Sequence, residues 1–153
     1  GILRIRRKTY LQQLRNPNGN GSQIYRLEMS ELSDLAEIQS FLAQSLKEQC
    51  PPLRVRKEGP GGLEVCGCKE TMQGKQKVDG YYFASTAAKP KDIRFYFFPI
   101  YTDPELFQLS EGLQKMLKGK SCFHVKKLSE EQQAEIRKII ALGVNRYNEK
   151  ELI

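Results

Sequence analysis

The chain has 153 residues and a net charge of +7, with 39% hydrophobic and 28% charged residues. This length suits one domain with a single continuous core, and the composition is ordinary for a globular protein. No apolar run approaches the roughly 20 residues that cross a bilayer, so a membrane protein is not expected. The four cysteines match no small disulfide framework, which favours reduced thiols and a cytoplasmic location.

Positive charge is concentrated near the N-terminus. Residues 1–28 hold six Lys or Arg side chains against a single acidic one, Glu28, and so carry +5 of the total +7. The turn formers of NPNGNGS (16–22) predict a loop within this stretch. We expect a basic arm over 1–28, which need not be native, and a single domain over 29–153. A short charge cluster is more often solvated than dedicated to phosphate, so a nucleic-acid partner is not expected.

The domain is predicted to begin with a helix. Apolar residues recur at helical spacing between 30 and 49, and Pro51-Pro52 prevents the helix from continuing. Three short segments rich in Val, Ile, Phe and Tyr then predict strands over 63–69, 78–86 and 92–98.

A second helical region follows the third strand. Asp103-Pro104-Glu105 predicts a helix start with proline at the first position, and Ser110 either restarts or kinks that helix before Gly119. Residues 121–126 predict a last strand, and the capping box at 129–132 opens a final helix. Short loops between the strands imply antiparallel pairing. The predicted fold is therefore α+β, an antiparallel sheet of about four to five strands with helices packed on one face.

Two phrases of the sequence carry a resemblance to a known family. The segments FYFFPIYTDPELF (95–107) and GKSCFHVKKL (119–128), together with the closing helix, resemble the YdhG-like family of small bacterial domains of unknown function. The resemblance implies a compact α+β domain, and some family members have been compared with the bacterial frataxins, which handle iron. It implies no catalytic residue, and the basic arm lies outside it.

Strand alternation separates two populations of side chains. Side chains alternate between the faces of a sheet with a period of two residues, so the apolar Leu63, Val65, Ile93, Phe95, Phe97, Phe123 and Val125 are predicted to meet the helices. The opposite, open face would then present Cys66, Cys68, Tyr82, Arg94, Tyr96, Phe98, Cys122 and His124. Aromatic residues with Arg and Cys suit an interface or a small-ligand cleft better than they suit a solvated surface.

Metal binding is the first alternative. Cys66, Cys68, Cys122 and His124 offer three sulfurs and one imidazole, a ligand set suited to zinc, although cysteines also pack as small hydrophobes. Iron would instead prefer oxygen ligands, and Glu31, Asp34 and Glu37 in the first helix predict a possible acidic ridge. Carboxylates favoured by the helix dipole explain the same ridge without iron.

A cysteine-dependent enzyme is the second alternative, because His124 is the only histidine and shares a predicted face with Cys122. No motif rises to a catalytic assignment. The sequence therefore predicts a non-enzymatic binding or assembly module, using the open face for self-association, a protein partner or a small ligand, with no defined cofactor.

Overall fold

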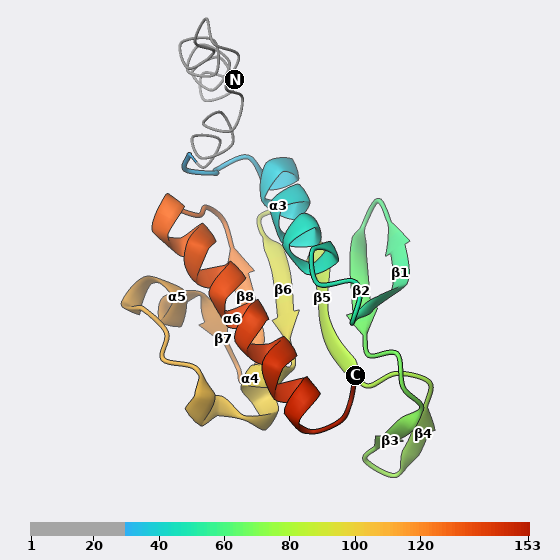
Figure 1. Cartoon of the computed structure of the whole chain (residues 1–153). Coiled ribbons are helices and arrows are strands. Elements are labelled where there is room, and N and C mark those ends of the chain that lie inside the picture. The colour runs from blue at the N-terminus through green and yellow to red at the C-terminus, as the bar shows by residue number, and fades with distance from the viewer. Residues whose placement is uncertain (1–29) are drawn as a thin grey trace, which may run out of the picture.

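A six-stranded antiparallel sheet forms the centre of this computed structural model, which describes residues 30–153 (Figure 1). The strands lie in the spatial order β1-β2-β5-β6-β8-β7. They are β1 (Arg54–Gly59), β2 (Gly62–Cys66), β5 (Tyr82–Ala88), β6 (Ile93–Phe97), β7 (Leu117–Lys118) and β8 (Cys122–Val125). A separate hairpin joins β3 (Thr71–Gln73) to β4 (Gln76–Val78). The predicted basic arm lies outside the described residues.

Two long helices cover one face of the sheet. Helix α3 (Leu35–Lys47) and helix α6 (Glu130–Glu149) lie side by side over that face (Figure 1). The Asp34 carboxylate caps α3 by accepting hydrogen bonds from the backbone N–H groups of Ala36 and Glu37. Helix α6 begins with the predicted capping box, in which Ser129 and Gln132 bond each other's backbone.

The chain between β6 and β8 forms three short helical segments at the β7 edge of the sheet (Figure 1). They are α4 (Pro99–Thr102), the 3₁₀ helix η1 (Pro104–Leu106) and α5 (Glu111–Met116). Pro104 opens η1 as predicted, and Ser110 restarts the helical chain by capping α5 with its side chain. Residues 98–121 are named the excursion below.

The core lies between the helices and the sheet. All seven apolar strand residues that alternation assigned to the helical face are at most 3% exposed. Edge-to-face contacts join Phe83 to Phe97 and to Tyr147 of α6, with ring centroids 5.6 and 5.1 Å apart. The antiparallel α+β fold with helices on one face is thus confirmed. The sheet has six strands, one more than the upper end of the expected range.

The described helices include none that combines the length and the apolar character required to span a bilayer.

Candidate functional site

The strand register gathers most of the predicted site residues on the open face, the side of the sheet opposite α3 and α6. Arg94 pairs with His124, and Tyr96 pairs with Cys122, so each pair projects from the same side of neighbouring strands. The Arg94 and His124 side chains are 30% and 28% exposed. Helices α3 and α6 lie on the opposite face of the sheet (Figure 1). These residues are therefore accessible to a ligand.

A buried carboxylate organises one end of the open face. Asp92 is 6% exposed, accepts a 2.7 Å hydrogen bond from Arg94 Nε, and has its other oxygen 3.7 Å from His124 Nδ1. The hydrogen bond to Asp92 raises the pKa of the Arg94 guanidinium, which stays charged. Sequence reasoning included Asp92 in the predicted strand 92–98 but did not select it as a site residue; the observed strand β6 begins one residue later, at Ile93. The even spacing of Asp92 from Arg94 and Tyr96 was the available signal.

A network of hydroxyl and thiol groups occupies the middle of the open face. The Tyr82 hydroxyl lies 2.6 Å from Ser85 Oγ, and Ser85 pairs with Tyr96 in the neighbouring strand. Burial raises the pKa of Tyr82 to about 12, against a smaller lowering by the Ser85 hydrogen bond. Burial likewise raises the pKa of the Cys122 thiol, although a hydrogen bond with Tyr96 and the charge of Arg94 oppose the shift. Cys122 is therefore a protonated thiol near neutral pH.

A cationic pocket of about 410 Å³ opens beside His124 and is named the basic pocket. Lysine side chains from α5, from β7 and from the two residues that follow β8 line it, namely Lys115, Lys118, Lys126 and Lys127. Lys118 pairs with Cys122 in the sheet, so its side chain belongs to the open face. Asp92 is the only acidic side chain in the lining, and its carboxylate is already bonded to Arg94.

The lysines of the basic pocket are largely free of carboxylate partners. Lys115 pairs with Glu111 at 3.4 Å, and both side chains are at least 75% exposed. Within residues 30–153, no carboxylate forms an ion pair with Lys118, Lys126 or Lys127. The local field is therefore positive, and an anion that enters the pocket meets ammonium groups without displacing an acidic side chain.

The four residues of the predicted zinc set are not assembled. Cys66 pairs with Tyr82, His124 pairs with Arg94, and the strands β5 and β6 separate β2 from β8. Cys68 lies beyond the end of β2, where its thiol donates to the Pro52 carbonyl at 3.0 Å. Across residues 30–153, no three His, Cys, Asp or Glu side chains are placed to hold a metal ion.

Cys66 is also inaccessible from the open face. It is 0% exposed. The Gly80 backbone packs so closely against Cys66 that a Cβ added at Gly80 would lie 3.0 Å from the Cys66 sulfur. Cys50 was not part of the predicted zinc set. Burial raises the pKa of the Cys50 thiol, and the nearby thiols of Cys68 and Cys66 add to the shift. These cysteines pack locally around the end of β2.

The structure gives the residues of the predicted acidic ridge, and Phe98, positions that differ from the prediction. The Asp34 carboxylate is used as the N-cap of α3, Glu31 precedes the helix, and Glu37 lies in its first turn. Phe98, expected on the third strand, lies one residue beyond β6 and has helical dihedral angles at the start of α4. Its ring contacts Tyr82 and stacks on Tyr101, at centroid distances of 5.6 and 5.5 Å. It therefore borders the open face from the end of the sheet.

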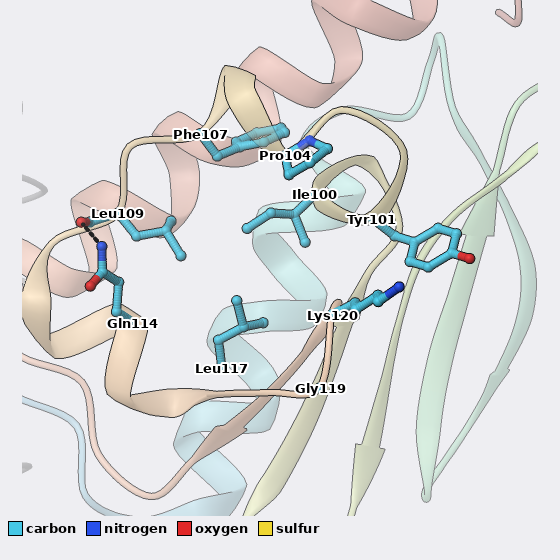
Figure 2. A pocket seen from close by; sticks show the side chains of 9 residues that line it. All are labelled: Ile100, Tyr101, Pro104, Phe107, Leu109, Gln114, Leu117, Gly119 and Lys120. Carbon is cyan, nitrogen blue, oxygen red and sulfur yellow. Dashed lines mark hydrogen bonds between the residues drawn. The ribbon is translucent and has the colours of Figure 1, made fainter.

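A second cavity, about 680 Å³ in volume, lies within the excursion and is named the apolar pocket (Figure 2). Its apolar lining comes from Ile100, Pro104, Phe107, Leu109 and Leu117. Polar groups are contributed by Tyr101, Gln114 and Lys120. The sequence analysis predicted a helical region over this segment but drew its candidate binding residues from the strands and the first helix, so it did not predict this pocket.

Comparison with known proteins returned no relative. No protein-family model matches the chain, no curated protein is similar to it, and no solved structure resembles it at a level that indicates relatedness. The resemblance to the YdhG-like family stays a prediction.

Proposed function

We propose that this protein is a non-enzymatic recognition module that binds an anionic ligand at the basic pocket on the open face of its sheet. The observation that carries the proposal is the lining itself: four lysines and His124 surround a cavity whose single carboxylate is bonded to Arg94. Ammonium groups bind phosphate and carboxylate groups as point charges, and a histidine adds a directional donor.

The chemistry of the open face supports binding over turnover. A cysteine nucleophile acts as its thiolate, and burial raises the pKa of Cys122 instead of lowering it. His124 Nδ1 lies 3.7 Å from an Asp92 carboxylate oxygen, and its partner across the neighbouring strand is Arg94, which is not a nucleophile. His124 also lines the basic pocket, where its imidazole is available to a ligand. No observation on residues 30–153 favours the metal-carrier alternative.

Inorganic pyrophosphate is a suitable probe, because it carries the charge of a phosphorylated ligand without any other group. We expect the full chain to bind it with an affinity that falls as salt is added. The variant Lys118→Gln/Lys126→Gln should weaken binding about tenfold, since loss of ~1.4 kcal/mol from two charge-assisted contacts corresponds to that factor. Isothermal titration calorimetry measures the affinity.

The matched control is Lys57→Gln/Lys75→Gln, which removes two exposed lysines away from the basic pocket. It changes the net charge equally and keeps residues 1–28, so the arm contributes the same in both variants. Unchanged affinity in the control supports the site. Equal losses in the two variants, or no pyrophosphate binding by the parent chain, would overturn the proposal.

Self-association through the middle of the open face is a second proposal. It is favoured by Tyr82 and Tyr96, which remain partly exposed on a sheet face without a covering helix in the described chain. Sedimentation velocity tests it: a dimer that Tyr96→Asp converts to monomer supports the proposal. A monomeric parent chain contradicts it and leaves the anion site to be judged by calorimetry.

A further inference from the structure

We infer that the apolar pocket binds a small amphipathic acid, a molecule with an apolar body and a single carboxylate that meets Lys120. The apolar pocket shares no lining residue with the basic pocket, so this is a second site. It is built entirely from the excursion, whose two ends join the neighbouring strands β6 and β8.

The interior of the pocket suits an apolar body. Figure 2 shows Ile100 and Leu117 pointing into the cavity from opposite sides, with Phe107 and Pro104 along its rim. The volume of about 680 Å³ falls inside the range of roughly 300–1,000 Å³ that is typical of small-molecule sites. Burying an alkyl or aromatic group against these side chains is favourable by about 25 cal/mol per Å² of apolar surface.

Charge is confined to one end of the pocket. The Lys120 ammonium lies 5.7 Å from the centroid of the Tyr101 ring, and Tyr101 is 50% exposed. Among residues 30–153, no acidic side chain forms an ion pair with Lys120. The Gln114 amide donates one of its two N–H groups to the Leu109 carbonyl at 3.1 Å, and because Gln114 is uncharged, Lys120 is the only charged side chain in the lining. A lone cation at the mouth of an apolar cavity selects one carboxylate attached to an apolar body.

The walls of the pocket are held in place without a ligand. Asp103, between α4 and η1, accepts a 2.6 Å hydrogen bond from Lys150 and lies 3.7 Å from Arg146, which anchors this segment to the end of α6. On the other side, the Ser110 hydroxyl bonds the Glu135 carboxylate of α6. A pocket fixed at both walls loses little conformational entropy on binding.

Octanoate is the probe, with 1-octanol and octyltrimethylammonium as neutral and cationic analogues of the same apolar length. We expect the full chain to bind octanoate saturably and more tightly than either analogue, as followed by NMR titration. Lys120→Gln should weaken octanoate binding roughly tenfold and leave octanol binding unchanged, because only the charged head group loses a partner. The matched control Lys75→Gln should alter neither.

A pocket-filling variant gives an independent readout. Leu117→Trp should reduce binding of octanoate and octanol together, and the far-ultraviolet circular dichroism spectrum reports whether the variant is folded. Lys120 lies at the exposed turn before β8, so the Lys120→Gln result stands even if Leu117→Trp does not fold. The inference is wrong if octanoate does not saturate, if octanol binds as tightly as octanoate, or if Lys75→Gln and Lys120→Gln weaken binding equally.

Discussion

At the scale of single residues, Asp103 is the most consequential buried charge. It is 6% exposed and connects the α4–η1 segment to Lys150 and Arg146 near the end of α6. Burial alone would raise the pKa of Asp103. Hydrogen bonds from Lys150 and Thr102, with the charges of Lys150 and Arg146, more than offset burial and lower the pKa. A lowered carboxyl pKa means that the ionised form stabilises the fold.

Asp103→Asn should therefore lower the free energy of unfolding near pH 7 by about 1–3 kcal/mol, the usual effect of removing a hydrogen bond to a charged group. Stability from a lowered pKa is fully present above the pKa of the unfolded chain, about 3.9. It is lost as pH falls through the folded value. The gap between variant and parent should shrink below about pH 4 in urea unfolding.

Asp79→Asn is the matched control, because Asp79 pairs with Arg54 at 2.7 Å but is 77% exposed. An exposed pair of this kind contributes about 0–1 kcal/mol. If Asp79→Asn destabilises the protein as much as Asp103→Asn, the anchoring role assigned to Asp103 is wrong.

Tyr82 gives a second test at the residue scale. Burial raises the pKa of its phenol to about 12, whereas an exposed tyrosine titrates near 10. The parent chain and Tyr82→Phe should thus show the same phenolate absorbance at 295 nm up to a pH of about 11. A difference between their absorbances with a midpoint near pH 10 would show that the Tyr82 phenol is more exposed to solvent than the structure indicates.

Alternation predicted the residues on regular strands and failed where the strands end. Arg94, Tyr96, Cys122 and His124 lie on β6 and β8, so a period of two assigns their faces correctly. Cys68 and Phe98 fall just past strand ends, where the backbone turns and the period no longer applies. The burial of Cys66 depends on Gly80, which no local pattern connects to it.

At the scale of elements, the contact between α6 and the sheet depends on Gly143. A Cβ at this position would lie 2.9 Å from Pro99 Cγ and 3.0 Å from Phe97 Cζ. The glycine therefore allows the helix to approach the aromatic core closely, at a cost in helix propensity of ~1 kcal/mol relative to alanine.

Gly143→Ala should destabilise the protein by about 1 kcal/mol, because overpacking typically costs 1–3 kcal/mol and exceeds the gain in propensity. Chemical denaturation measures the change. The control Asn145→Ala adds alanine to an exposed position of the same helix, and it should be neutral or slightly stabilising. A Gly143→Ala variant more stable than the parent would contradict the close packing described for α6.

The elements that sequence analysis missed are polar or short. Strand β1 is rich in charged residues, as edge strands often are, and its Val55 is 36% exposed. The β3–β4 hairpin turns at Gly74, which has a φ of +64°, and its strands have three residues each. Strand β7 has only two residues. None presents an apolar alternation long enough to detect.

At the scale of the whole molecule, two chemically different pockets lie around the β7 edge of the sheet. The basic pocket faces the open side of the sheet, and the apolar pocket lies within the excursion. The chain between Lys115 and Lys120 contributes to both, with Lys118 lining one and Lys120 the other. The sequence predicted a recognition surface on the open face, but its cationic corner depends on α5 and β7, which only the three-dimensional arrangement brings to His124.

The most direct test of the central claim is an NMR titration of the isotope-labelled full chain with inorganic pyrophosphate. The account predicts saturable shifts of the backbone amides of Lys118, His124 and Lys126, with smaller changes elsewhere. Shifts confined to residues 1–28, or no saturable shift at these three amides, would contradict the claim that the open face of the sheet binds an anion.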